Sequence, residues 1–182
     1  PSNRLLEVTR KDLVEGYVGQ TATKTARVVK RAVGGVFFID EAYSLMGDNF
    51  GQEATNTILP MLLDYKGKMV CIAAGYPREI RQWIDTNSGL ESRFTKVIHF
   101  EDYNPDELAQ IFRMKVKKDK LTLTSEAENA MRVYFTDLYN RRERNFANAR
   151  EVNNYFDRVK KNQSSRLRHE MERPDFDPAS YS

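Results

Sequence analysis

The chain has 182 residues, of which 40% are hydrophobic and 30% are charged, a composition that is usual for globular proteins. This length is enough to bury a real core in one domain or in two small ones. The formal net charge of +3 is too small to favour nucleic acid as a partner. No apolar run approaches the ~20 residues that a membrane-spanning helix needs.

The cysteine content and the chain ends set further bounds. The single cysteine, Cys71, lies inside an apolar run, so we expect a core residue rather than a nucleophile. One cysteine cannot form a disulfide framework within the chain, which fits a reducing compartment. No signal peptide is visible, so we expect a cytoplasmic protein without a membrane partner. Because the chain starts at Pro1 without methionine, we expect a fragment or a processed form.

Strand and helix patterns alternate through residue 100. Strands are predicted at residues 4–8, 36–39, 69–75 and 96–100. Helices are predicted from Thr21 or Thr23 to about 33, from about 52 to 65, and from 78 to 86. We expect residues 11–20 to form a loop, and Pro60 to kink or split its helix. Strand–helix alternation of this kind predicts an α/β fold with a parallel sheet and helices on both faces.

The rest of the chain has helical patterns only. Asn104, Thr124 or Ser125, and Asn148 each precede an amphipathic helix, and the last of these helices runs to about Met171. We therefore expect a large α/β domain at residues 1–102 and an all-helical domain at 103–171. The tail at 172–182 shows no periodicity and is expected to be loose.

Two carboxylates follow the most apolar predicted strand. Val36 to Ile39 are bulky or β-branched, which is typical of a strand buried on both faces, and Asp40 and Glu41 come next. Ligands of open α/β sheets bind at the carboxyl ends of the strands. There Asp40 can hold Mg²⁺ and Glu41 can orient a water that attacks a γ-phosphate, which is the Walker B pattern. A strand that merely happens to end in acidic residues is the alternative.

A second candidate lies in the loop before the first long helix. Gly16 and Gly19 flank Tyr17 and Val18, so the backbone there is permissive and can direct an aromatic side chain outward. A glycine turn with the aromatic ring folded back onto the surface is the structural alternative.

Several motifs occur in an order and at spacings that are typical of one family. On them the chain resembles, over roughly residues 4–170, the AAA+ ATPases of the CbbX (red-type rubisco activase) and stage V sporulation protein K group. The motifs are Glu-Gly-Tyr-Val-Gly-Gln-Thr at 15–21, Gly-Gly-Val-Phe-Phe-Ile-Asp-Glu-Ala-Tyr-Ser-Leu at 34–45, Phe-Gly-Gln-Glu-Ala at 50–54, Ala-Gly-Tyr at 74–76, Gly-Leu-Glu-Ser-Arg-Phe at 89–94 and Phe-Ala-Asn-Ala-Arg-Glu-Val at 146–152.

The resemblance implies an incomplete AAA+ parallel sheet flanked by helices, then a small helical lid, with ATP and Mg²⁺ as cofactors. Asp40 and Glu41 match the Walker B pair. Arg93 matches the arginine finger that reaches a γ-phosphate held by the next subunit, and Arg150 matches the sensor-2 arginine. Ordinary salt bridges are the alternative for both arginines. If the source is an alga, the plastid stroma replaces the cytoplasm.

The resemblance also implies an assembly. An arginine that acts in trans requires a closed ring of identical subunits, a hexamer by analogy. Tyr17, Val18 and Gly19 match the pore loop that grips a threaded polypeptide. The implied activity is ATP hydrolysis by a ring motor that remodels a protein substrate.

The sequence departs from the family in three places. No Gly-x-x-x-x-Gly-Lys-Ser/Thr loop, which cradles phosphates, is present. In AAA+ domains the strand before that loop lies between the strand ending at Gly75 and the one at residues 96–100, so two apolar edges would lack partners. Ala74-Gly75-Tyr76 lacks the polar side chain common at the sensor-1 position, and Asn153 stands where relatives often have arginine.

Two readings of the function therefore stay open. The chain is part of an ATPase motor, or it is a non-catalytic assembly module that binds partners but not nucleotide. Nucleic-acid binding is a weaker third reading. Residues 141–173 carry ten Lys and Arg against five Asp and Glu, but such helices are more often solvated faces or subunit contacts.

Overall fold

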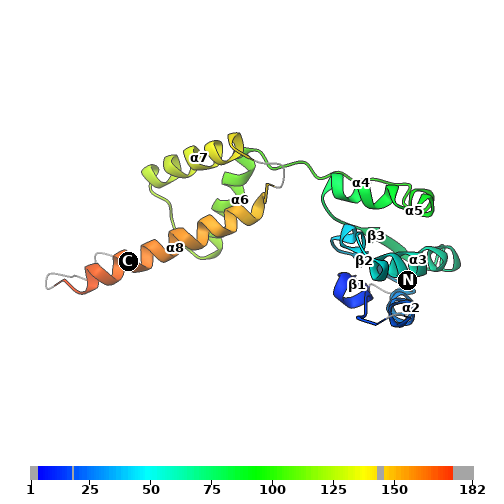
Figure 1. The fold of residues 1–182 in the computed structure, drawn as a ribbon. Helices are drawn as coiled ribbons and strands as arrows, with labels where there is room; N and C mark the ends of the chain where they lie inside the picture. Colours follow the sequence, from blue (N-terminus) through cyan, green and yellow to red (C-terminus); the bar gives the residue numbers. More distant parts are fainter. Residues whose placement is uncertain (1–3, 18, 143–145, 174–182) are drawn as a thin grey trace. The chain divides into compact units, whose positions relative to one another are not determined.

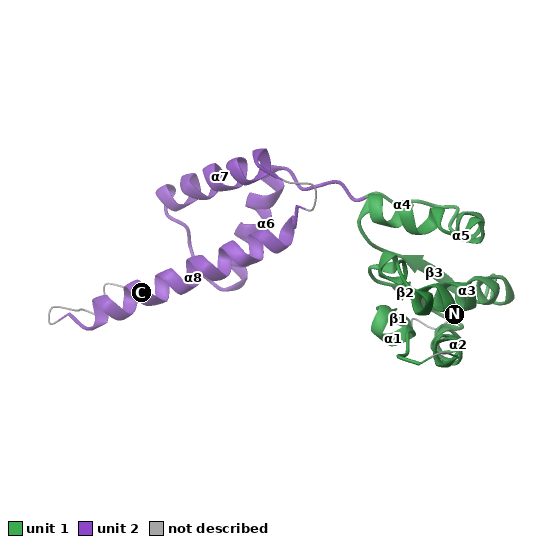
Figure 2. Ribbon diagram, viewed as in Figure 1, with its two compact units in different colours: residues 1–99 green, residues 100–182 purple. Residues whose placement is uncertain are grey.

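The computed structural model describes residues 4–17, 19–142 and 146–173 (Figure 1). The chain divides into two compact units, residues 1–99 and residues 100–182 (Figure 2). Each unit has its own hydrophobic core. Within the described ranges, no helix combines the length and the apolar character needed to cross a membrane.

Unit 1 contains a parallel sheet of three strands in the order β1-β2-β3. The strands are β1 (Leu5–Val8), β2 (Val36–Ile39) and β3 (Val70–Ala73). Val8, Ile39 and Ala73 are register partners at the carboxyl end of the sheet. Each crossover between neighbouring strands contains a long helix, as parallel pairing requires. The predicted α/β architecture is confirmed.

The two faces of the sheet differ in burial. In register, the first face carries Leu6 and Val8 of β1 and the fully buried Phe37 and Ile39 of β2. Apart from the exposed Glu7, the opposite face is apolar but open at its margins, where Leu5 and Val70 are 58% and 57% exposed. Val36 and Phe38 lie between them and are half-buried. The prediction that β2 is buried on both faces is therefore wrong for the second face, because the described residues cover it only in part.

The helices of unit 1 contribute to a single core with the first face of the sheet. They are α1 (Arg10–Leu13), α2 (Gln20–Ala32), the 3₁₀ turn η1 (Ala42–Leu45), α3 (Asn49–Asp64), α4 (Pro77–Asp85) and α5 (Ser88–Arg93). The helix α2 packs against α3, and α4 packs against η1 and α5. Cys71 packs against this core, and burial raises the pKa of its thiol to about 12, as expected for a residue that is not a nucleophile.

Two local predictions are wrong, and of the two effects expected at Pro60, a kink or a split, the split does not occur. Residues 11–20 are not all loop, because α1 closes one helical turn with a capping box between Thr9 and Asp12. The helix α2 is capped by Gly19 in a left-handed conformation, while Thr21 is fully buried inside the helix. Pro60 does not split α3. Pro60 has no N–H to donate to the Asn56 carbonyl. Asn56 and Pro60 are both exposed, so this carbonyl does not lose its partner inside the core.

The predicted strand at residues 96–100 does not form. Val97, Ile98 and Phe100 have strand-like side chains but are 84%, 67% and 86% exposed. A strand needs a neighbour to satisfy its backbone hydrogen bonds, and the described sheet ends at β3. The apolar segment is therefore correctly identified, but its secondary structure is not.

The described part of unit 2 is a bundle of three helices, as the sequence predicts. They are α6 (Pro105–Lys118), α7 (Ser125–Asn140) and α8 (Ala149–Met171). Asn104 caps α6 and forms a capping box with Glu107. The core is rich in aromatic residues, with the ring of Phe112 packed against those of Phe135 and Phe156.

Candidate functional site

The acidic pair lies where β2 ends, at the carboxyl edge of the sheet. The Asp40 N–H donates to the Val8 carbonyl at 2.8 Å, which extends the pairing with β1 by one residue. On the other side, the Ala42 N–H donates to the Ala74 carbonyl at 3.0 Å. Asp40 and Glu41 are thus held between two neighbouring strands. Asp40 is half-buried and Glu41 is exposed, so both are placed at the rim where α/β sheets bind ligands.

Glu41 has an unusual backbone conformation. Its φ of 49° and ψ of 46° are left-handed, a region that residues other than glycine adopt at an energetic cost. The Glu41 N–H donates to the Asp40 carboxylate at 3.1 Å, and the Glu41 carbonyl accepts from the Ser44 N–H at 2.7 Å. Such strain is typical of functional sites, where the surrounding structure maintains it. The sequence gives no indication of this conformation.

Two tyrosines accompany the pair, although sequence reasoning assigned them no role. The rings of Tyr43 and Tyr76 lie 6.3 Å apart. A side chain on Gly75 would meet the Tyr43 ring at 2.7 Å, so only glycine permits this packing. Burial raises the pKa of Tyr43, and the negative charge of Glu41 adds to the shift. Tyr43 therefore belongs to the surroundings of the Glu41 carboxylate.

The residues present fit the magnesium part of a nucleotide site. No group of three or more His, Cys, Asp or Glu side chains that could hold a metal ion occurs among the residues the structure describes. Mg²⁺ in nucleotide sites uses one or two carboxylates together with phosphate oxygens and waters, so Asp40 alone is a sufficient protein ligand. The phosphate cradle itself is not in this sequence.

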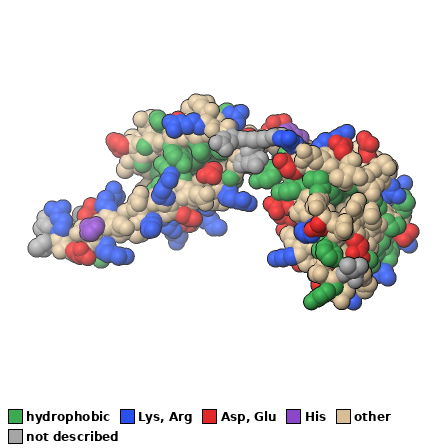
Figure 3. All heavy atoms as spheres, viewed as in Figure 1, with side chains coloured by type: hydrophobic (Ala, Val, Ile, Leu, Met, Phe, Trp, Pro, Cys, Tyr) green, Lys and Arg blue, Asp and Glu red, His purple; other side chains and the backbone are tan. Residues whose placement is uncertain are grey.

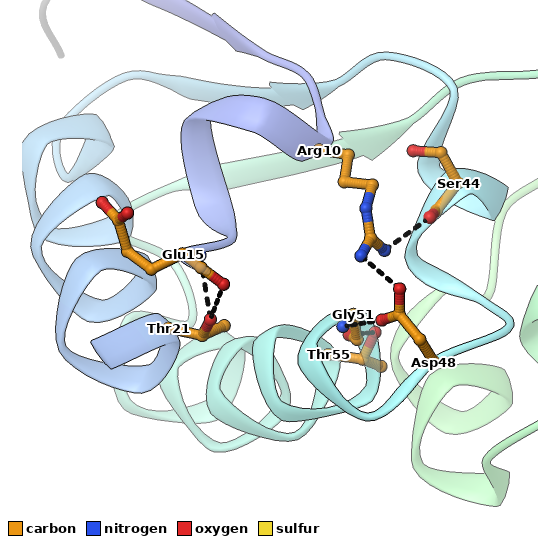
Figure 4. Close-up of polar contacts among 7 residues, drawn as sticks. All are labelled: Arg10, Glu15, Thr21, Ser44, Asp48, Gly51 and Thr55. Atoms are coloured by element: carbon orange, nitrogen blue, oxygen red, sulfur yellow. Dashed lines mark hydrogen bonds and ion pairs between the residues drawn. The ribbon is translucent and has the colours of Figure 1, made fainter. Parts of the chain in front are cut away.

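Tyr17 lies on a short loop between α1 and α2 and is 75% exposed. The loop is fixed at both ends: the Glu15 N–H donates to the Thr21 hydroxyl at 2.9 Å (Figure 4), and the Thr25 hydroxyl donates to the Leu13 carbonyl at 2.9 Å. Gly19 has a φ of 82°, which favours glycine there. Val18 lies outside the described residues. The expected outward-pointing aromatic is present on an anchored loop.

Arg93 ends α5 and is half-buried. Its guanidinium donates to the Leu59 carbonyl at 3.2 Å through Nε and to the Gly89 carbonyl at 3.0 Å through Nη1. Across the described ranges, no hydrogen bond or ion pair joins Arg93 to Asp40 or Glu41. Arg93 is thus neither sealed in the core nor brought to the acidic pair of its own chain.

Arg150 is the second residue of α8 and is exposed. It belongs to unit 2, whereas the acidic pair belongs to unit 1. The residue before α8, Asn148, makes no side-chain cap hydrogen bond to that helix but is held by other contacts. Its side chain donates to Asp102 at 2.7 Å and accepts from the Tyr103 N–H at 2.8 Å. The start of α8 is thereby tied to the segment that precedes α6.

Comparison with known proteins places both parts of the chain in one family. Residues 2–102 match the model for the ATPase family associated with various cellular activities (AAA), and residues 104–179 match the AAA lid domain. The chain is 42% identical over 168 residues to a CfxQ homologue of Trieres chinensis, with 90% of this chain and 57% of the relative covered.

Other relatives give the same picture. Protein CbbX of Cereibacter sphaeroides is 41% identical, with 90% of this chain and 53% of the relative covered. The chloroplastic ribulose bisphosphate carboxylase/oxygenase activase of Cyanidioschyzon merolae is 40% identical, with 90% and 56% covered. The chain spans about half the length of these curated relatives. With an α/β unit followed by a helical lid, and with these matches along its length, the chain is similar to CbbX and belongs to the AAA family of ATPases.

Proposed function

We propose that this chain is part of a ring-forming, Mg-ATP-dependent motor that remodels a protein substrate by drawing a polypeptide through a central pore. The observation that carries the proposal is the acidic pair at the carboxyl end of β2, where Asp40 and Glu41 are held between neighbouring strands. Family membership supports ATP as the nucleotide. The large subdomain is assigned to residues 1–102 and the lid to 103–171, while residues 174–182 of the expected tail lie outside the described residues.

The proposed roles follow from the chemistry of each side chain. When bound, Mg²⁺ would neutralise charge on the phosphates, and Asp40 is its protein ligand. Glu41, exposed at the rim, accepts a hydrogen bond from the attacking water and orients it. Arg93 supplies positive charge to the site of the neighbouring subunit, which fits its lack of a contact with the acidic pair of its own chain. Arg150 contacts nucleotide from the lid.

Tyr17 is proposed to contact the threaded polypeptide, with Val18 and Gly19 beside it. Its exposure of 75% and its anchored loop support this role, because a side chain that grips a substrate must be accessible and must transmit force to the domain. The substrate is a protein. Rubisco is a candidate, since one relative is named as its activase. The proposed location is the cytoplasm, or the plastid stroma in an alga.

The phosphate-binding segment is proposed to pack on the open edge of β3 and against residues 96–100. Val70 and Ile72 of β3 are 57% and 42% exposed, and Phe100 is 86% exposed. An apolar edge strand such as β3 favours the addition of another strand, and residues 96–100 would then pair as a strand with the added one. The strand that the family places between them would satisfy both edges.

A second candidate function is a non-catalytic assembly module, which the missing phosphate loop favours for the 182-residue chain by itself. Titration of the protein with Mg-ATP distinguishes the motor proposal from the assembly module. The motor proposal predicts weak or no binding by the chain alone, and micromolar binding when a segment with the family's phosphate loop is joined to its N-terminus. No binding even by the joined protein would favour the assembly module.

Nucleic acid is not proposed as a partner. Figure 3 shows Lys and Arg side chains interspersed with Asp and Glu rather than gathered on one visible face. Several basic residues of the helical unit are also engaged in ion pairs, such as Lys160 with Asp119 and Arg142 with Asp102.

A further inference from the structure

Arg10 bridges two segments that are far apart in the sequence. It starts α1, directly after β1, and its guanidinium reaches the chain that follows Glu41 (Figure 4). Nη1 donates to the Ser44 carbonyl at 2.8 Å, and Nη2 donates to the Asp48 carboxylate at 2.6 Å. Ser44 belongs to η1, the 3₁₀ turn that begins immediately after Glu41. Arg10 therefore holds the segment from Ser44 to Asp48, which follows the acidic pair in the chain.

The geometry around this contact is tight. The Asp48 carboxylate also accepts from the Gly51 N–H at 2.8 Å and so caps α3. A Cβ on Gly51 would lie 2.3 Å from the Leu45 carbonyl oxygen and 2.6 Å from Arg10 Nη1, so a larger residue would displace the arginine or the backbone. The turn between η1 and α3 thus has one well-defined arrangement around the guanidinium.

Arg10 also begins α1, the helix that directly precedes the Tyr17 loop. The helix α1 ends at Leu13, which is fully buried and whose carbonyl accepts from Thr25 of α2. The next fixed point is Glu15, held by Thr21 (Figure 4). The chain between Arg10 and Tyr17 is thus held at Leu13 and again at Glu15.

The exit from the loop is tied to α3 as well. Glu53, in the first turns of α3, accepts from the Ala22 N–H at 3.2 Å, near the N-terminus of α2. Asp48 at the start of α3 is the partner of Arg10. Both ends of the Tyr17 loop are therefore connected to the segment that follows Glu41, one end through Arg10 and the other through Glu53.

We propose that Arg10, with Asp48, is a positioning residue that couples the conformation of the segment after Glu41 to the position of the Tyr17 loop. The functional meaning of this coupling rests on the proposed function, in which these two places are the hydrolysis site and the substrate-gripping loop. The alternative is a local surface ion pair, which would add stability without coupling anything. Coupling requires that a substitution at Asp48 changes the conformation or the dynamics of the Tyr17 loop.

Hydrogen exchange of the 182-residue chain tests the coupling without any need for activity. Asp48→Asn removes the charge but retains the cap, because asparagine caps helices as well as aspartate does. Amides of residues 10–20 should exchange several-fold faster in this variant, while those of α7 in unit 2 stay unchanged. Arg10→Lys, whose single terminal nitrogen does not reproduce the two-nitrogen fork that contacts Ser44 and Asp48, should give the same pattern. Asp85→Asn is the matched control, since it removes an ion pair with Arg81 elsewhere in unit 1.

Exchange at residues 10–20 that is no faster in Asp48→Asn and Arg10→Lys than in Asp85→Asn would overturn the inference. A second readout uses a full-length protein with a phosphate loop, where Asp48→Asn should lower the ratio of substrate-stimulated to basal ATP hydrolysis at least threefold. An unchanged ratio would also overturn it. The proposed function fails separately: if Tyr17→Ala remodels substrate normally while the exchange result holds, Arg10 positions a loop that is not a pore loop.

Discussion

The backbone N–H of Glu41 donates to the carboxylate of Asp40 across 3.1 Å, so a single hydrogen bond joins the two acidic residues at the end of β2. The contact uses Oδ1 of Asp40, and in the part of the chain that the structure describes no hydrogen bond to Oδ2 occurs. The Asp40 carboxylate therefore keeps oxygen lone pairs with which it would hold Mg²⁺. The same contact accompanies the left-handed backbone of Glu41, which turns the chain from the strand into η1.

Replacement of Tyr17 by alanine should reduce substrate remodelling by the full-length protein at least tenfold and reduce basal ATP hydrolysis far less. The loop backbone is anchored by Thr21 and Thr25, so the lost ring is the main change. Remodelling and hydrolysis are measured in the same preparation. Tyr17→Phe is the matched control and should retain most of the remodelling, because the ring is kept. Equal losses in both variants would argue against a gripping aromatic.

Acid should remove part of the stability of unit 1 through Asp48. The hydrogen bond from Arg10 lowers the pKa of this carboxyl, and the Gly51 N–H adds to the effect. Because the folded-state pKa is lower than the unfolded value of ~3.9, the charged form stabilises the fold above pH ~4, and this contribution is lost as the pH falls through the folded pKa. Urea denaturation should show wild type more stable than Asp48→Asn near neutral pH. The difference should shrink towards zero in acid, and a difference independent of pH would contradict the assignment.

Gly51→Ala should destabilise unit 1 by about 1–3 kcal/mol, the usual cost of forcing atoms into a filled space. The new methyl group would meet the Leu45 carbonyl and the Arg10 guanidinium. The free energy of unfolding is measured by urea denaturation. Gly16→Ala is the control, since a Cβ there would have no neighbour within 4 Å. If the two variants unfold alike, the packing around Arg10 is looser than the structure describes.

The extent to which the sequence predicts this molecule depends on whether the relevant interactions are local. The run from Val36 to Ile39 and the capping signals at Asn104 and Thr124 act over a few residues, and the elements they predict are present. The segment from 96 to 100 has the side chains of a strand, but a strand also depends on a neighbour that the described sheet does not contain. The composition of residues 96–100 alone could not reveal that this neighbour is missing.

Missed features fall into two kinds. The capping box of α1, Thr9 with Asp12, is a local signal that could have been found. The contact between Arg10 and Asp48 joins residues 38 positions apart, and nothing in the spacing of either residue predicts it. Thr21 looks like a helix cap in the sequence but lies buried inside α2, where its hydroxyl accepts from the Glu15 N–H.

The role of Glu41 is the central claim, and ATP hydrolysis and ATP binding measured side by side for Glu41→Gln in the full-length protein test it most directly. Glutamine has nearly the same shape but is a poor base, so turnover should fall at least a hundredfold while ATP binds with an affinity within a few-fold of wild type. Glu79→Gln on the neighbouring helix α4 is the control and should hydrolyse ATP normally. Turnover by Glu41→Gln at the wild-type rate would contradict the account.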